Sequence, residues 1–134
     1  MADKLITLLL VEDNPGDASL IRRMLSSING PFEIIHVTML KECLTRLRNG
    51  GIDLVLLDLG LPDCSGLETL TRTRAEAPHI PIIVVTGLSE RETAVQALNQ
   101  GAQDFIAKER VDVHLLSQAV LRSVGAGRKV PEGG

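Results

Sequence analysis

Short apolar runs alternate with stretches of helical periodicity along the whole chain. Five runs have the length and the β-branched and leucine content of strands, at residues 5–11, 32–37, 54–57, 80–85 and 104–107. Between and after them, apolar residues recur at intervals of three and four, as on one face of a helix. These intervals predict helices over residues 15–28, 40–49, 65–77, 89–100 and 113–124. The predicted order is therefore a strand followed by a helix, five times.

This alternation predicts an α/β fold in which a five-stranded parallel sheet carries helices on both faces. The run Leu54-Val55-Leu56-Leu57 has no polar residue and is typical of a central strand buried on both faces. Right-handed crossovers restrict such a chain to a few doubly wound arrangements.

Three helix starts carry capping signals. Asn14 precedes Pro15, a cap followed by a favourable first helical residue. The segment 65–68 (Ser-Gly-Leu-Glu) has capping-box spacing, and so do Ser89 and Glu92. We therefore expect side-chain caps at these three helices.

Composition narrows the class of protein. The 134 residues fit one domain, the net charge is −3, and there is no Trp, no Tyr and only two Phe. The core must be aliphatic, and we expect neither base stacking on nucleic acid nor membrane binding. No apolar run approaches the roughly 20 residues of a membrane span. Cys43 and Cys64 follow no secretory signal, so we expect free thiols and a cytoplasmic protein. We expect His36, His79 and His114, which do not cluster, to be surface or packing residues.

Polar residues follow four of the five predicted strands where each strand ends: Glu12, Asp13, Asp58, Thr86 and Lys108. The carboxyl ends of parallel strands share one edge of a sheet, where ligands bind. Three carboxylates gathered there would repel one another, and a hard cation such as Mg²⁺ would relieve this. A lysine and a hydroxyl beside them could neutralise a phosphoryl group, and a carboxylate could accept it as a nucleophile.

Each of these residues also has an ordinary explanation when taken alone. Glu12 and Asp13 could favour the start of the next helix, Thr86 could belong to a turn, and Lys108 could be a solvated surface lysine. Their joint occurrence after four different strands favours one shared site.

The motifs that contain these residues resemble a receiver domain of a two-component response regulator, from about Lys4 to Val124. Four segments carry the resemblance: Val11-Glu12-Asp13-Asn14, Leu57-Asp58-Leu59-Gly60-Leu61-Pro62-Asp63 with Gly66, Val85-Thr86-Gly87, and Gly101-Ala102-Gln103-Asp104-Phe105-Ile106-Ala107-Lys108. Any one would be weak alone, but their combined spacing is specific.

The resemblance implies a flavodoxin-like fold with strand order 2-1-3-4-5. It implies that Asp58 accepts a phosphoryl group from a histidine kinase or phosphotransfer protein, and that Thr86 and Lys108 bind the phosphoryl oxygens. Mg²⁺ would be held by Asp13, Asp58 and the carbonyl of Gly60, with Glu12 acting through water. Such a protein catalyses its own phosphorylation and slow dephosphorylation, and is not otherwise an enzyme.

Four positions depart from the commonest family pattern. The resemblance pairs Thr86 with Phe105 as the switch residue. Because Phe105 lacks a hydroxyl, the two alternatives for it are an inward apolar rotation and a role in core packing alone. Glu109 follows the lysine where many relatives have proline, and we expect a trans bond or a remodelled loop. Gly60 and Leu88 offer no polar group to orient a hydrolytic water, so we expect a long-lived phosphoryl group.

Three other functions compete with this interpretation, and the sequence argues against the first two. An aspartate-nucleophile phosphohydrolase needs a second acid two residues after the nucleophile, where this chain has Gly60. A flavin-binding domain needs a neutral or basic first loop and aromatic side chains, which are lacking. The remaining alternative is a degenerate receiver that binds proteins independently of phosphorylation.

The expected organisation is a receiver domain over residues 1–124 and a flexible tail or linker stub over residues 125–134. A downstream protein or domain is the expected target, and a second copy of the chain is a further candidate partner. The sequence identifies neither the kinase nor the target.

Overall fold

The computed structural model describes residues 5–28, 32–87 and 91–127. The strands are β1 (Ile6–Val11), β2 (Phe32–Val37), β3 (Leu54–Leu57), β4 (Gly60–Leu61), β5 (Cys64–Ser65), β6 (Ile82–Thr86) and β7 (Asp104–Ala107). The helices are α1 (Pro15–Ser26), α2 (Leu40–Asn49), α3 (Leu67–Glu76), α4 (Arg91–Asn99) and α5 (Val113–Gly127), and Lys108–Arg110 forms a 3₁₀ turn. Within these ranges, no helix combines the length and the apolar character needed to cross a membrane.

One five-stranded sheet organises the chain, with strand order β2-β1-β3-β6-β7. Every neighbouring pair is parallel. The short strands β4 and β5 form a separate ribbon. When the five long strands alone are numbered along the chain, their order in the sheet is 2-1-3-4-5. The predicted fold class and strand order are therefore confirmed.

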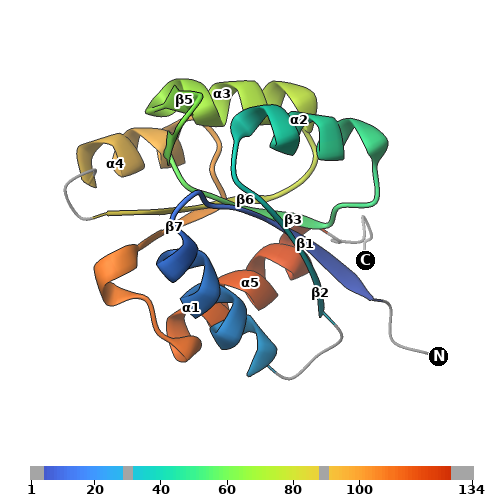
Figure 1. Cartoon of the computed structure of the whole chain (residues 1–134), viewed down its shortest axis with the longest axis vertical. Helices are drawn as coiled ribbons and strands as arrows, with labels where there is room; N and C mark the ends of the chain where they lie inside the picture. The colour runs from blue at the N-terminus through green and yellow to red at the C-terminus, as the bar shows by residue number, and fades with distance from the viewer. Residues whose placement is uncertain (1–4, 29–31, 88–90, 128–134) are drawn as a thin grey trace.

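Helices cover both faces of the sheet, α1 and α5 on one and α2, α3 and α4 on the other (Figure 1). Successive residues of β1 point alternately to the two sides because a strand has a period of two. Leu8 and Leu10 pack in the core on the α1–α5 side, and Leu9 and Val11 pack in the core on the opposite side. Both cores are aliphatic, apart from the half-buried Phe32 and Phe105 packed against them, as the composition predicts.

The predicted helix caps have different outcomes. Asn14 caps α1, and its side chain accepts the N–H of Asp17 at 2.9 Å. The predicted cap of α3 by Ser65 is wrong, because Ser65 pairs with Gly60 in the β4–β5 ribbon. The N-cap is Gly66 instead, with a φ of 74° that glycine adopts without strain and no side-chain bond. Ser89, from the third predicted cap, lies outside the described residues.

Six elements, β1, α1, α3, β6, α4 and α5, begin or end one to three residues away from their predicted bounds. Two of these differences have a clear physical reason. β6 begins at Ile82 instead of residue 80, since pairing with β3 starts at the pair Val55 and Ile82. Helix α5 continues to Gly127, whereas the sequence predicts its end near Val124. A glycine costs a helix only about 1 kcal/mol, too little to end one already packed through Val120. Residues 128–134 lie outside the described part of the chain.

Candidate metal centre

Three carboxylates meet at the carboxyl end of the sheet, as the strand order predicts. Glu12 and Asp13 directly follow β1, and Asp58 directly follows β3. Val11 and Leu57 are register partners on neighbouring strands, which brings the residues after them side by side. One oxygen from each carboxylate lies within 4.8 Å of the others. Glu12 and Asp58 are buried, with 1% and 6% exposure, and Asp13 is exposed.

Main-chain hydrogen bonds hold the two buried acids in place. The N–H of Glu12 donates to the Val37 carbonyl and that of Asp58 to the Val11 carbonyl, each at 3.1 Å. The sheet ladder thus extends one residue beyond both strands. The Asp58 carboxylate also accepts the N–H of Gly60 at 3.2 Å, which turns the chain into β4.

His36 supports the same site from the edge strand β2. Its Nε2 lies 2.8 Å from the carbonyl oxygen of Glu12. The sequence predicts only a surface or packing role for this histidine, and its proximity to the acidic cluster went unpredicted. The sequence feature that could have indicated this contact is the position of His36 near the end of a strand that lies beside β1.

Lys108 supplies the positive charge of the site. It follows β7, and its Nζ lies 2.8 Å from Glu12 Oε1, 2.9 Å from Asp17 Oδ2 and 3.2 Å from Asp58 Oδ2. Sequence reasoning missed the contact with Asp17, which comes from the first turn of α1. One ammonium therefore serves three carboxylates.

Burial and charge oppose each other at this cluster. Burial raises the pKa of Glu12 to about 7, against the lowering effects of Lys108 and of the Asn14 N–H, which donates to Oε2 at 3.0 Å. The Asp58 charge contributes to this raised pKa in the same direction as burial. Burial lowers the pKa of Lys108, but its contacts with Glu12, Asp17 and Asp58 outweigh this and leave the pKa raised. The site therefore carries more negative charge than Lys108 neutralises.

The donor set fits a hard divalent cation. Glu12 Oε1 is buried and accepts no directed hydrogen bond, although Lys108 Nζ is within ion-pair distance. An oxygen with spare acceptor capacity, grouped with two other carboxylates, is suited to Mg²⁺, which takes oxygen ligands. Glu12, Asp13 and Asp58 are the residues able to hold it.

Comparison with known proteins gives the family. The family model described as the response regulator receiver domain matches residues 8–120. The chain belongs to this family. This agrees with the resemblance seen in the sequence motifs and with the sheet order.

Two relatives of this receiver domain are named as regulatory proteins. Swarming motility regulation protein RssB of Serratia marcescens is 37% identical over 113 residues, which are 84% of this chain and 51% of the relative. Regulatory protein LuxO of Vibrio vulnificus is 35% identical over 99 residues, which are 74% of this chain and 21% of the relative. The chain thus spans about half, or less, of the length of these relatives.

A solved relative bears on the metal. The receiver domain of a sensor histidine kinase from Pseudomonas aeruginosa has a TM-score of 0.78 and 27% identity, covering 91% of this chain and 99% of its own. Its structure is described with a magnesium ion coordinated in the active site cleft.

The other predicted site residues lie along the same edge of the sheet. Thr86 ends β6, is buried, and pairs in register with Ala107, the residue before Lys108. Gly60 begins β4 two residues after Asp58 and is exposed. Leu88 lies outside the described residues. The Lys108–Glu109 peptide is trans, as predicted, since no cis bond occurs among the described residues.

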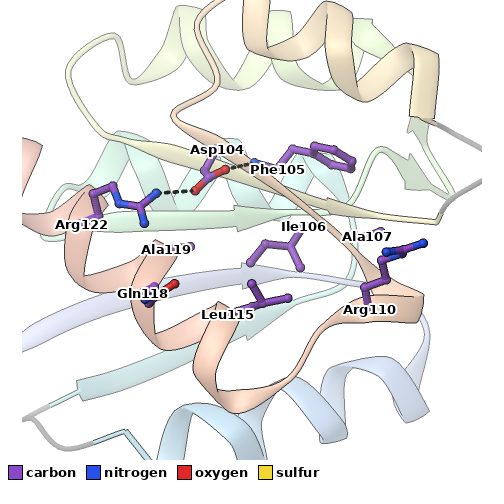
Figure 2. Close-up of a pocket in the computed structure, with 9 residues that line it drawn as sticks. All are labelled: Asp104, Phe105, Ile106, Ala107, Arg110, Leu115, Gln118, Ala119 and Arg122. Carbon is purple, nitrogen blue, oxygen red and sulfur yellow. Dashed lines mark hydrogen bonds and ion pairs between the residues drawn. The ribbon is translucent and has the colours of Figure 1, made fainter.

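Phe105, the predicted switch residue, lies on β7 three residues before Lys108 and is half-buried. Its ring packs against the core on the side of α2, α3 and α4. In Figure 2 it points away from Ile106 and Leu115, which lie on the α5 side of the strand. The ring is therefore neither fully inside nor fully outside the protein.

A separate cavity of about 510 Å³ lies between β7 and α5 (Figure 2). At one end Asp104 and Arg122 form an ion pair at 3.6 Å, and Arg110 lines the other end. None of the three clustered carboxylates lines this cavity. It belongs to the surface of β7 and α5 and not to the acidic site.

Proposed function

We propose that this receiver domain accepts a phosphoryl group on Asp58 from the phosphohistidine of a histidine kinase or phosphotransfer protein, in a Mg²⁺-dependent reaction. The observation that carries the proposal is the position of the Asp58 carboxylate. It is buried at the carboxyl edge of the sheet, 3.2 Å from Lys108 Nζ, and grouped with Glu12 and Asp13.

In the proposed step an Asp58 oxygen attacks phosphorus. A P–O bond forms while the P–N bond to the donor histidine breaks, and the electron pair of that bond stays on the histidine nitrogen. Gly60 N–H and Lys108 orient the carboxylate, since each contacts a different oxygen of it. Asp58 is thus held ready for in-line attack without a separate base.

Charge stabilisation is the main requirement of phosphoryl transfer. Asp13, Asp58 and the Gly60 carbonyl would hold Mg²⁺, with Glu12 acting through water, and the ion would supply positive charge for the phosphoryl oxygens. Lys108 adds a second positive charge, and the Thr86 hydroxyl is the proposed donor to a phosphoryl oxygen. The protein catalyses only its own modification, so it is a phosphoacceptor and not an enzyme acting on a separate pool of substrate.

The proposed output is a conformational change read by a downstream protein or domain. Movement of Thr86 toward the phosphoryl group would leave room for Phe105 to rotate inward, and its half-buried ring is consistent with two positions. A relative named for regulation of swarming motility supports a signalling role. We propose that this role is played in the cytoplasm and that this domain does not contact nucleic acid directly. A second copy of the chain is a further candidate partner.

We further propose that the phosphoryl group is long-lived, because Gly60 has no side chain to orient water. A Cβ placed at Gly60 would meet no atom within 4 Å, so a side chain fits there. Gly60→Gln should shorten the lifetime of the phosphorylated protein about tenfold, while Gly60→Ala should leave it unchanged. Lifetimes are measured by intact mass after removal of the phosphodonor. A half-life of seconds in the natural protein would contradict this proposal.

The decisive experiment incubates the protein with acetyl phosphate and Mg²⁺ and measures intact mass. We expect a gain of about 80 Da, one phosphoryl group, that requires Mg²⁺ and disappears in Asp58→Asn. Asp53→Asn is the matched control, because Asp53 precedes the same strand at its other end and accepts the Thr7 N–H at 2.9 Å. That variant should still be modified. No gain in a folded protein would favour the degenerate binding module instead.

A further inference from the structure

Among the described residues, Asp17 is the one carboxylate partner of Lys108 that stands outside the three-carboxylate cluster of Glu12, Asp13 and Asp58. It lies in the first turn of α1, where its own N–H donates to Asn14 Oδ1 at 2.9 Å. Its Oδ2 accepts a hydrogen bond from Lys108 Nζ at 2.9 Å, shorter than the 3.2 Å bond from the same Nζ to Asp58. The helix cap thus fixes the backbone of a residue whose carboxylate holds the lysine.

Three carboxylates surround the Lys108 ammonium, two as hydrogen-bond acceptors and Glu12 at ion-pair distance. An ammonium has three N–H donors, and Lys108 Nζ already faces Glu12, Asp17 and Asp58. A phosphoryl group brings additional strong acceptor oxygens and negative charge. To bind Lys108, those oxygens must compete with the three carboxylates for its ammonium.

Asp17 is the partner best placed to release the ammonium. Glu12 is 1% exposed and Asp58 carries the phosphoryl group, whereas the Asp17 side chain is 39% exposed and can be hydrated when released. The energy of a half-exposed ion pair is modest, so the exchange is reversible. While the contact persists, its negative charge also opposes an incoming anionic phosphodonor.

We propose that Asp17 is a positioning residue that holds the Lys108 ammonium in the unphosphorylated state and competes with the phosphoryl group for it. This inference rests on the proposed phosphorylation of Asp58. It assigns α1 a direct part in setting how strongly the phosphorylated state is favoured. Loss of the Asp17 charge should therefore favour that state.

The first test measures binding of beryllofluoride with Mg²⁺, a phosphoryl analogue, by two-dimensional NMR. Asp17→Asn should bind about two- to fivefold more tightly than the natural protein, the range expected from a half-exposed ion pair. Asp17→Glu keeps the charge and should stay closer to the natural protein. Glu33→Gln is the control for net charge, since Glu33 is exposed and pairs with Thr7 near the start of β2, far from the site.

A second readout needs neither metal nor phosphoryl group. Lys108 in Asp17→Asn should react faster with acetic anhydride, measured by peptide mass, because one of its three carboxylate partners has lost its charge. Faster labelling together with tighter beryllofluoride binding supports the inference. Unchanged labelling of Lys108 in Asp17→Asn, or unchanged or weaker beryllofluoride binding by this variant, overturns the inference. The proposed function is still supported in that case, provided that the natural protein binds beryllofluoride. If the natural protein binds no beryllofluoride and gains no phosphoryl mass, both proposals fail.

Discussion

Two partly buried cations, Lys108 and Arg74, lie at opposite ends of the sheet and are held in different ways. Arg74, in the last turn of α3, donates from Nη1 to the carbonyl of Ile80 at 2.8 Å and from Nη2 to that of Gly101 at 2.6 Å. The same Nη1 also contacts the carbonyls of Ala77 and Pro78. Lys108 contacts carboxylate side chains instead.

The difference separates a structural charge from an exchangeable one. Backbone carbonyls are fixed by the fold and neutral, so Arg74 has no competing partner and joins the start of β6 to the loop before β7. Carboxylates can be replaced by another anion, so Lys108 can change partners without unfolding anything. The kind of acceptor, more than burial, distinguishes the two roles.

The largest expected effect is on phosphorylation in Lys108→Met, which keeps an apolar stem and removes the charge. The rate with acetyl phosphate should fall about 100-fold, as when one preorganised donor is removed from a transition state. Arg74→Met is the matched variant, and its rate should stay within about twofold. If Arg74→Met were phosphorylated tenfold more slowly than the natural protein, the two ends of the sheet would not have separate roles in stability and phosphorylation.

A second prediction concerns stability. Arg74→Met should lower the free energy of unfolding by about 2 kcal/mol, because backbone carbonyls lose a charged donor. Arg48 is the control, since its ion pair among the described residues is with the side chain of Glu76 and its own side chain is 62% exposed. Arg48→Met should change stability by less than about 0.5 kcal/mol. Urea denaturation followed by circular dichroism measures both, and equal losses would contradict the comparison.

Asp63 extends the comparison to the opposite charge. Its carboxylate accepts the N–H groups of Leu40 at 2.8 Å and Lys41 at 3.0 Å, so it caps α2 from a distant loop. The N-cap residue Met39 makes no side-chain bond itself. Because its partners are backbone groups, as those of Arg74 are, Asp63 has a structural role. Asp63→Ala should lower the free energy of unfolding by about 1 kcal/mol and leave phosphorylation unchanged.

The pH dependence of this cap has a definite sign. The slight burial raises the pKa of Asp63, but the bonds from the Lys41 and Leu40 N–H groups outweigh it and leave the pKa below its usual value. The stabilisation is therefore present above the unfolded pKa and is lost as the pH falls through the lower folded pKa. The stability difference between the natural protein and Asp63→Ala should shrink in that acid range. A difference independent of pH there would rule out an ionised cap.

Much of the fold and the acidic cluster followed from local patterns. The strands Phe32–Val37 and Asp104–Ala107 match their predicted bounds, and the sheet edge brings Glu12, Asp13 and Asp58 together. These features depend on hydrophobic period and on chain direction, which a sequence displays.

The contacts of Asp17 and Asp63 could not be predicted, because each joins residues distant in sequence. Asp17 meets Lys108 across 91 positions, and Asp63 caps a helix that begins 23 positions earlier. Capping rules consider only local partners, and they assigned Ser65 to α3. Which side chain fills a cap depends on how the loops pack after the sheet has formed.

The loop after Asp58 has a mechanical consequence. Gly66 N–H donates to the Leu59 carbonyl at 2.7 Å, β4 pairs with β5, and Asp63 ties this loop to α2. Three separate attachments make this side of the site stiff. When the charge at Asp58 changes, we therefore expect the backbone of this loop to move little. We expect the larger backbone displacement on the side of β6 and β7. Stiffness on one side would give the response its direction.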